Sequence, residues 1–461
     1  MPDDTARLLP EEEIASYDDY LAMGGGEGLR RALDLSPEEV AQRVLDSGLR
    51  GRGGAGFPTG MKWSSVAEAA DDGSDVYLVC NAAEGEPGTY KDRLLMARNP
   101  YQLIEGVLIG MYASKAERGF IGMKEKMHHE LERMGDALQA MVEAGWRGAD
   151  LVTLIPGPDE YLYGEESAML EVIEGKLPMP RILPPYQVGL FATMQSPNPT
   201  VVNNVETLSH VTHILAKGVD WFRQMGTEET PGTMVFTVLG DVENEGLFEL
   251  PMGTPLRTLI EDIAGGTDVM AIHSGTSNTI ITPDLLDLPM DFDSFKEAGT
   301  GLGSGGFIVY GSHRDIVQVT EVLTRFLAVE SCGQCNACKI GTRELFKRLE
   351  RLVQGVGTHA DIEEIRKFCV TVTDLNRCYL PVGASLLVAS TLEAFPQAFI
   401  DHIGVASDPA VAVMVPKIDH IDEDTGKVIL DDQYYRKRRD WSYAPPGVSA
   451  EVSGTADTDT A

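Results

Sequence analysis

The stretch SGLRGRGGAGFPTG, residues 47–60, contains six glycines in fourteen residues. Three of them, Gly51, Gly53 and Gly56, satisfy the dinucleotide-binding pattern G-x-G-x-x-G. A Rossmann fingerprint follows a strand and opens a helix, whereas here we expect a helix before the stretch and none directly after residues 57–58. The pattern alone is therefore weak evidence for NAD. The glycines still suit a loop that lies against a flat ring system, because they carry no side chain.

The segment before the glycine-rich stretch has the signals of an amphipathic helix. Ser36 is a candidate N-cap, Pro37 occupies the first helical position, and Glu39 completes a capping box. Gly48 marks the end of this helix. The glycine-rich stretch thus follows a helix, which is not the context of a Rossmann loop.

Downstream, predicted strands alternate with predicted helices, and this alternation indicates an α/β domain. The alternating elements are expected at 75–83, 100–116, 118–124, 126–146, 150–157 and 165–175, with a further helix at 203–218. The proline-rich segment 176–200 is expected to be an irregular connection. Short strands and one helix, at 255–266, follow and indicate a small module of the β-grasp kind.

The remaining chain is expected to be mostly helical over 315–403, and five of the six cysteines lie there. A possible hairpin follows at 414–432, then a basic run, and the last residues have the composition of a disordered segment. The predicted division of the chain is an N-terminal arm with one helix (1–35), an α/β domain (36–230), a β-grasp module (231–312), a helical domain (313–405) and a C-terminal extension (406–461).

The overall composition limits the possible partners. The chain of 461 residues has a formal net charge of −33, which disfavours nucleic acid and anionic lipid as direct partners. No run approaches eighteen apolar residues, so membrane insertion is not expected. The acidic N-terminus lacks the features of a secretory signal. We therefore expect a cytoplasmic protein, in which cysteines serve metal binding or catalysis more often than disulfides.

Three of the cysteines follow a C-x2-C-x2-C spacing, at Cys332, Cys335 and Cys338. This spacing favours a [4Fe-4S] cluster, which needs a fourth thiolate. A ferredoxin-like run would place that cysteine at Thr342, so the fourth ligand must come from Cys369 or Cys378. The alternatives are a zinc site made of four cysteines, which usually uses two C-x2-C pairs, and unrelated buried thiols.

Five motifs in order now carry a resemblance to a known family: GLRGRGGAGFPTGMKW, CNAAEGEPGTYKDR, YGEESAMLE, VVNNVETL and ESCGQCNACKIGT. The chain resembles, over about residues 28–403, the NADH-binding flavoprotein subunit of respiratory complex I. Relatives of that subunit include the diaphorase subunits of NAD-linked formate dehydrogenases and hydrogenases. The resemblance implies bound FMN, an NADH site stacked upon it and a [4Fe-4S] cluster. It also implies a non-classical Rossmann-like FMN-binding domain, an SLBB-like β-grasp module and a helical iron–sulfur domain.

The resemblance also assigns roles to residues. It makes Cys378 the fourth cluster ligand and leaves Cys369 as a packed core thiol. It implies flavin, phosphate or nucleotide contacts for one set of residues: Gly51, Arg52, Gly53, Gly56, Phe57, Lys62, Asn81, Gly164, Tyr186, Asn203, Asn204 and Thr207. It places a second set at the reacting rings: Glu86, Tyr161, Glu165 and Glu166.

Some of these roles have plainer alternatives. The asparagines at 203–204 precede a predicted helix whose N-terminus suits a phosphate, but they also suit simple helix capping. Glu165 and Glu166 suit compensation of a helix dipole as well as a role at the rings. The chain also departs from the family pattern at Ala83, where Asp is common.

Further departures lie at Ser65 and Leu183, where an aromatic and a basic residue are usual, and at Tyr163, where cysteine is common. The function implied is NADH oxidation through FMN, with single electrons passed to the cluster. The alternatives are the same chemistry run toward NAD reduction in a soluble formate dehydrogenase or hydrogenase, and an iron–sulfur relay or scaffold without flavin activity.

Partners follow from the same resemblance. Because the chain has one predicted cluster, a partner must take the electrons. The family supplies a thioredoxin-like [2Fe-2S] subunit followed by a larger iron–sulfur or catalytic subunit. The basic run 436–439 is interpreted either as a docking site for such a partner or as a solvated tail.

Overall fold

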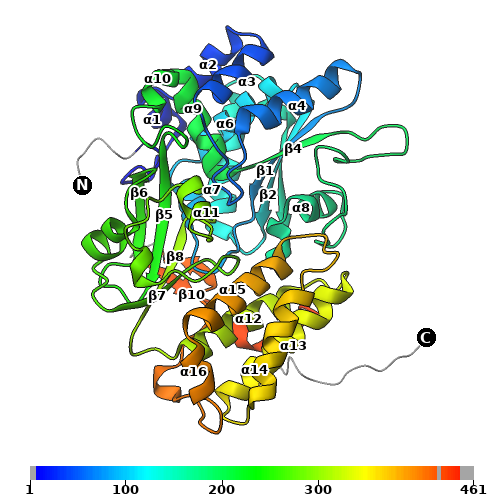
Figure 1. Ribbon diagram of the computed structural model, residues 1–461. Helices are drawn as coiled ribbons and strands as arrows, with labels where there is room; N and C mark the ends of the chain where they lie inside the picture. Colours follow the sequence, from blue (N-terminus) through cyan, green and yellow to red (C-terminus); the bar gives the residue numbers. More distant parts are fainter. Residues whose placement is uncertain (1–6, 423–426, 447–461) are drawn as a thin grey trace.

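The computed structural model of the chain describes residues 7–422 and 427–446 (Figure 1). Its N-terminal part contains helices α1 (Tyr17–Ala22), α2 (Glu27–Leu33), α3 (Pro37–Asp46) and α4 (Thr59–Asp71). The prediction of one helix before residue 36 is wrong, since α1 and α2 both form there and bury Tyr20 and Leu29 in the core. The predicted capping box at the start of α3 is confirmed, with the Ser36 hydroxyl accepting from the Glu39 amide.

Four parallel strands form the central sheet of the first domain. They are β1 (Tyr77–Ala82), β2 (Arg118–Lys124), β3 (Val152–Gly157) and β4 (Thr200–Asn204), in the order β3-β2-β1-β4. The topology changes direction at β1, which lies between β2 and β4. Ligands of open parallel sheets bind at the carboxyl ends of the strands near such a point.

Helices cover this sheet on both faces, as Figure 1 shows. The apolar helix α6 (Pro100–Ser114) is almost wholly buried and contacts β1 and α9. The other elements of this part are α5 (Lys91–Arg98), α7 (His128–Glu143), η1 (Ala149–Leu151), η2 (Tyr161–Gly164), α8 (Glu166–Ile173), α9 (Val205–Lys217) and α10 (Val219–Phe222).

A second sheet of four mixed strands follows. It contains β5 (Thr233–Gly240), β6 (Gly246–Pro251), β7 (Val269–Ser274) and β8 (Gly306–Gly311), in the order β6-β5-β8-β7. The predicted helix at 255–266 is a single π-helical segment, η3 (Thr258–Ile263), and η4 (Pro283–Leu285) and α11 (Phe292–Glu297) follow it.

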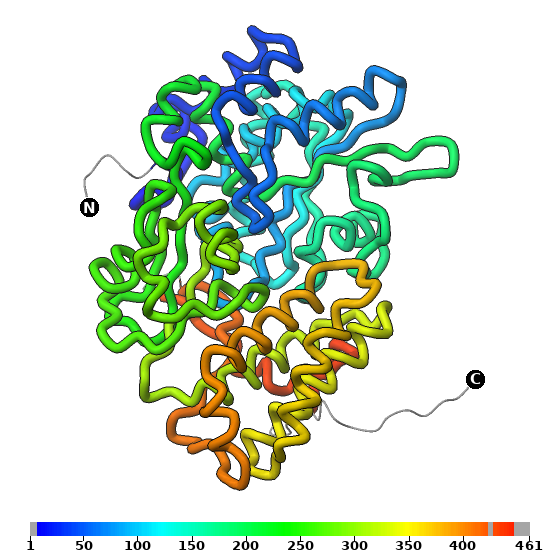
Figure 2. The backbone as a smooth tube through the Cα atoms, viewed as in Figure 1, coloured from blue at the N-terminus to red at the C-terminus, as the bar shows by residue number. Residues whose placement is uncertain are grey.

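The third part is helical, as predicted. Its helices are α12 (Ile316–Glu330), α13 (Asn336–Val353), α14 (His359–Thr371), α15 (Leu380–Ala394) and α16 (Pro396–Asp401). Beyond them lie η5 (Pro409–Val411), β9 (Ile418–Ile421), β10 (Val428–Leu430) and η6 (Tyr434–Arg436). The predicted hairpin is confirmed as the antiparallel pair β9–β10. The C-terminal segment, red in Figure 2, returns to the helical part, whereas the segment predicted to be disordered lies largely outside the described residues.

The predicted α/β class, with its parallel sheet and helical cysteine-bearing region, is confirmed, but several elements were missed, and three of them show why. Helix α4 begins directly after Pro58, so the expectation of no helix there is wrong; its start has no side-chain cap to signal it. Helix α5 is rich in charge, a pattern typical of a surface, yet it buries Lys91 and Arg93. Strand β4 is five residues long and ends directly at a helix, which leaves little pattern to detect.

The close crossing of α6 and α9 supports a prediction on stability. A Cβ atom on Gly106 would lie 2.1 Å from the Leu208 carbonyl oxygen. We expect Gly106→Ala to lower the free energy of unfolding by about 1–3 kcal/mol, because the two backbones must separate. The matched control is Gly135→Ala in α7, where an added Cβ meets nothing within 4 Å. Urea unfolding should show the control equal to or more stable than the parent chain, and equal losses in both variants would contradict the prediction.

Candidate nucleotide and iron–sulfur site

Two segments meet at the carboxyl end of β1. The Asn81 side-chain amide donates to the Gly164 carbonyl at 2.7 Å, which ties β1 to η2. From α4, the Lys62 ammonium donates to Glu166 Oε1 at 2.7 Å and to the Val202 carbonyl at 2.8 Å. The predicted residues Lys62, Asn81, Gly164 and Glu166 are therefore brought together at the sheet edge.

The glycine-rich loop lies beside this edge and is closed by a hydrogen bond from the Gly51 amide to the Phe57 carbonyl at 2.9 Å. Gly56 has a φ of 61°, and a Cβ there would lie 2.8 Å from the Phe292 ring. A Cβ on Gly53 would lie 3.0 Å from the Asn204 Cβ. Glycine is thus required here both by the backbone conformation and by close neighbours.

The Arg52 side chain is engaged within the protein, and the predicted contact of Arg52 with the cofactor stays a prediction. Its guanidinium is fully buried and donates to the carbonyls of Thr233 and Pro231, at 3.2 and 2.9 Å. Burial lowers the pKa of Arg52 to about 10. The side chain therefore fastens the glycine loop to β5, and its backbone amide is bound to the Thr207 hydroxyl at 2.8 Å.

The segment predicted to bind phosphate is held by internal hydrogen bonds. Asn203 Oδ1 accepts from the Trp63 indole at 2.8 Å. Asn204 is the N-cap of α9, with Oδ1 accepting from the Glu206 amide at 2.9 Å and the amide group donating to Asp92 at 2.6 Å. The helix-capping interpretation is therefore what the structure shows for Asn204. A phosphate contact for this segment stays a prediction.

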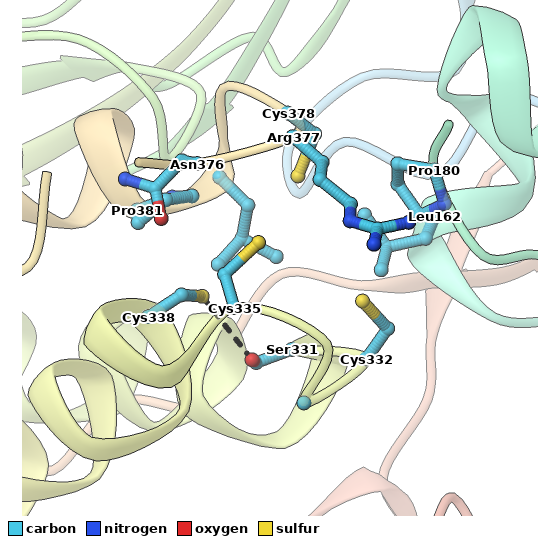
Figure 3. Close-up of a pocket in the computed structure, with 12 residues that line it drawn as sticks. Leu162, Pro180, Ser331, Cys332, Cys335, Cys338, Asn376, Arg377, Cys378 and Pro381 are labelled. Carbon is cyan, nitrogen blue, oxygen red and sulfur yellow. Dashed lines mark hydrogen bonds between the residues drawn. The ribbon is translucent and has the colours of Figure 1, made fainter. Parts of the chain in front are cut away.

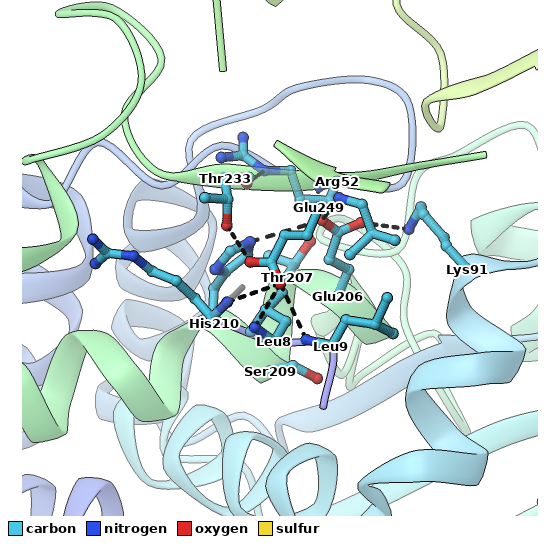
Figure 4. Close-up of polar contacts among 12 residues, drawn as sticks. Leu8, Leu9, Arg52, Lys91, Glu206, Thr207, Ser209, His210, Thr233 and Glu249 are labelled. Carbon is cyan, nitrogen blue, oxygen red and sulfur yellow. Dashed lines mark hydrogen bonds and ion pairs between the residues drawn. The ribbon is translucent and has the colours of Figure 1, made fainter. Parts of the chain in front are cut away.

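A buried charge cluster lies next to this helix start (Figure 4). Lys91 lies 2.8 Å from Asp92 and 2.8 Å from Glu206, and neither Lys91 nor Glu206 is exposed. Burial would raise the pKa of Glu206, but the Lys91 ammonium lowers it to about 2. Glu206 also accepts from the Val235 amide of β5 at 2.8 Å, so it joins α9 to the second sheet.

Glu86 and Tyr161, predicted at the reacting rings, contact each other. The Tyr161 hydroxyl donates to Glu86 at 2.5 Å, and the other Glu86 oxygen accepts from the Thr276 amide and hydroxyl. Burial, and then the Glu86 charge, raises the pKa of Tyr161 well above its ordinary value. The Tyr161 amide donates to Glu330 at 3.1 Å, which leads toward the cysteines.

The remaining predicted residues differ in whether their side chains are already hydrogen-bonded or are exposed. Glu165 caps α8, accepting from the amides of Ser167 and Ala168, and burial raises its pKa. This favours the capping interpretation for Glu165. Phe57 and Tyr186 are about half exposed, at 49% and 51%, and so keep aromatic faces open.

The structure also shows the surroundings of the four residues that depart from the family pattern. Leu183 is 48% exposed, Ser65 is exposed, and Ala83 is fully buried in a small cluster with Tyr163. The Tyr163 ring fills space over Gly157, where a Cβ would lie 2.5 Å from it, and its hydroxyl donates to the Ile155 carbonyl. The sequence offered no reason for Tyr163, and the structure supplies one in packing.

All four predicted ligand cysteines line one cavity (Figure 3). The sulfur atoms of Cys332 and Cys335 approach from the loop before α13, that of Cys338 from the first turn of α13, and that of Cys378 from the loop before α15. Leu162, next to Tyr161, also lines this cavity. The segment that contains Tyr161 and Leu162 therefore lies directly beside the cysteines.

Comparisons with known proteins bear on both halves of this site. A family model described as the Nuo51 FMN-binding domain matches residues 44–213. A second, described as the NADH-ubiquinone oxidoreductase-F iron-sulfur binding region, matches residues 318–402. A curated relative from Rhizobium meliloti, the F subunit numbered 2 of NADH-quinone oxidoreductase, is 41% identical, covering 86% of this chain and 96% of its own. The corresponding F subunit of Escherichia coli is 39% identical, over 79% of this chain and 84% of its own.

The chain belongs to the family of NADH-quinone oxidoreductase F subunits. A solved structure, the NAD+-reducing [NiFe]-hydrogenase in the H2-reduced state, matches with a TM-score of 0.75 and 33% identity, covering 85% of this chain and 67% of that chain. In the air-oxidised state the TM-score is 0.73, and this chain spans 65% of that chain's length. The predicted family and its cofactors, FMN and a [4Fe-4S] cluster with NADH as substrate, are confirmed.

The donor set of the cavity fits the cluster. Four cysteine thiols line the cavity, and four thiolates are the ligand set of a [4Fe-4S] cluster. The Ser331 hydroxyl lies 3.2 Å from Cys338 Sγ, and the Gln334 amide lies 3.5 Å from Cys332 Sγ.

Several residues of the site were not predicted. Thr276 lies in the turn after β7, Glu330 ends α12, and Gln334 is inside the cysteine motif. The two interpretations of the basic run as a docking site or a solvated tail are both wrong for Lys437, which is 1% exposed and lies 2.8 Å from Glu330. A lysine among arginines gives no local signal of burial, because its partner is distant in sequence.

The membrane expectation can be compared directly with the helices. Within residues 7–422 and 427–446, none of the helices has the length and apolar character needed to cross a bilayer. The relatives carry names that mark them as subunits, so partner chains are expected as well.

The choice of the fourth ligand gives a second prediction. We expect Cys378→Ser to lose most bound iron and sulfide, because this sulfur faces the cavity. The matched control is Cys369→Ser, since Cys369 is buried among the helices away from the cavity lining. Iron and sulfide analysis with cluster absorbance checks both variants. Retention of the full cluster in Cys378→Ser, or its loss in Cys369→Ser alone, would reverse the assignment.

Proposed function

We propose that this chain binds FMN at the carboxyl edge of the first sheet, oxidises NADH there and passes single electrons to a [4Fe-4S] cluster. One observation carries the proposal: residues 161–166 border both halves of the site. Tyr161 is hydrogen-bonded to Glu86 on the nucleotide side, and its neighbour Leu162 lines the cysteine cavity. The arrangement supports a two-electron donor site coupled at short range to a one-electron acceptor.

Bound FMN supplies the redox chemistry, accepting a hydride and releasing electrons one at a time. The chain supplies binding and orientation. The glycine loop borders the proposed flavin site, and Phe57 and Tyr186, each about half exposed, offer aromatic faces for stacking. Lys62 places a cation at the sheet edge, and Glu86 is fixed by Tyr161 and Thr276 so that its charge has one position.

The proposed setting is a complex that also holds a thioredoxin-like [2Fe-2S] subunit and a larger iron–sulfur or catalytic subunit. We place it in the cytoplasm, peripheral to the membrane through that complex. A second setting is a soluble NAD-linked hydrogenase or formate dehydrogenase, in which the chain works toward NAD reduction. The 33% identity to the NAD+-reducing hydrogenase favours keeping this candidate. Metal analysis of the purified complex separates the settings, since nickel or molybdenum would indicate the second.

The direct test is anaerobic addition of NADH to the purified chain. The flavin absorbance should bleach, and the reduced cluster should then give an EPR signal. A preparation that holds a full cluster but no flavin, or flavin that NADH leaves unbleached, would favour the relay or scaffold function instead.

Lys62 provides a prediction on flavin binding. We expect Lys62→Met to weaken FMN binding by about tenfold to a hundredfold, because a charge-assisted hydrogen bond is worth about 1.5–3 kcal/mol. Lys176→Met is the matched control, since Lys176 is 55% exposed and pairs with Glu174 on the surface. Flavin fluorescence titration of the deflavinated chains gives both affinities. Equal affinities in the two variants would remove Lys62 from the flavin site.

A further inference from the structure

The described part of the C-terminal extension, residues 406–422 and 427–446, lies beyond the iron–sulfur family model, which ends at residue 402. It is nevertheless fastened to both parts of the site. On the nucleotide side, Lys417 lies 2.5 Å from Asp159, and the Pro416 carbonyl accepts from the Gly88 amide. On the cluster side, the Arg325 guanidinium of α12 donates to the carbonyls of Tyr435 and Lys437.

Glu330 connects the C-terminal extension to the Tyr161 segment and to the cysteine loop. It is the last residue of α12, is not exposed, and lies two residues before Cys332. One oxygen accepts from the Tyr161 amide at 3.1 Å. The other accepts from the Tyr434 hydroxyl and the Lys437 ammonium, both at 2.8 Å.

Aromatic packing follows the same path. The Tyr161 ring meets Phe326 of α12 edge-on, with centroids 5.1 Å apart. Phe326 in turn packs against Tyr434 of the extension, with centroids 5.6 Å apart. The extension thus contacts the Tyr161 segment through a hydrogen-bonded carboxylate and through packed rings.

The charge of this pair has a definite sign at the cluster. Lys437 Nζ lies 2.8 Å from Glu330 Oε1, and both side chains are buried. The pair of Glu330 and Lys437 is therefore neutral as a unit. Removing either charge leaves a net charge in a buried place next to the cysteine loop, where the field is weakly screened. Net charge and hydrogen bonding near a cluster set its reduction potential.

We propose that Lys437 is a positioning residue for flavin-to-cluster electron transfer. Through Glu330 it fixes the Tyr161 amide relative to the Cys332 loop, and its charge balances that carboxylate beside the cluster. The C-terminal extension therefore contributes a charged residue, Lys437, to the redox site. The inference rests on the proposed function, because that function supplies the electron transfer from flavin to cluster. The reduction potential of the cluster can nevertheless be measured whether or not NADH reacts.

The experiment compares Lys437→Met, Glu330→Gln and the double variant in the full chain with its cofactors. An EPR-monitored titration with a chemical reductant gives the cluster potential. We expect Lys437→Met to lower it, Glu330→Gln to raise it, and the double variant to return it toward that of the parent. Arg438→Met is the matched control, because Arg438 is the exposed neighbour of Lys437, and its cluster potential should remain that of the parent.

Kinetics provide the second readout. In Lys437→Met we expect cluster reduction after NADH mixing to slow roughly tenfold, in the range seen for partners beyond a metal's direct ligands, while flavin bleaching keeps its parent rate. Shifts of one sign in both single variants, or a Lys437→Met potential equal to that of Arg438→Met, would overturn the proposal. If Lys437→Met does not fold, Glu330→Gln decides, since its potential must rise. Absent bleaching in the parent chain would instead count against the proposed function.

Discussion

The buried ion pair between Lys91 and Glu206 is the constraint on which the site depends. Two charges removed from water are costly, and breaking such a pair by removing one partner typically costs about 3–5 kcal/mol. Here the pair joins α5 to the start of α9, and Glu206 also accepts from the Val235 amide of β5. One turn of helix carries both Glu206 and Thr207, which holds the Arg52 amide of the glycine loop. The first sheet, the second sheet and the loop are thus fixed relative to one another at one place.

From that fixed point the site extends along residues 161–166. Asn81 holds the Gly164 carbonyl, Lys62 holds Glu166, and Glu330 holds the Tyr161 amide. Each of these three partners comes from a different element: β1, α4 and α12. A segment held from three directions loses little freedom when a ligand arrives, which is how a preorganised site orients a cofactor. The same restraint keeps the nucleotide edge and the cysteine cavity at one separation.

The sequence was informative where the signals were local. The capping box at Ser36 and the buried run of β1 predicted their elements, and the C-x2-C-x2-C spacing predicted the cluster. Sequence failed where the deciding partner was remote. The position of the Arg52 side chain could not be predicted from the glycine loop, because its guanidinium donates to carbonyls 181 and 179 residues away.

The placement of positive charge follows from the acidity of the chain. The chain has 38 basic and 71 acidic side chains, so a lysine or arginine on the surface can pair with many exposed carboxylates. A buried carboxylate has no such choice and must be matched inside. Buried cations include Lys91 beside Glu206, Lys417 beside Asp159 and Lys437 beside Glu330, and each of these carboxylates lies at a junction between parts of the fold. In this acidic protein these three buried lysines form ion pairs at contacts between different parts of the fold. These contacts lie next to the nucleotide edge and the cysteine cavity.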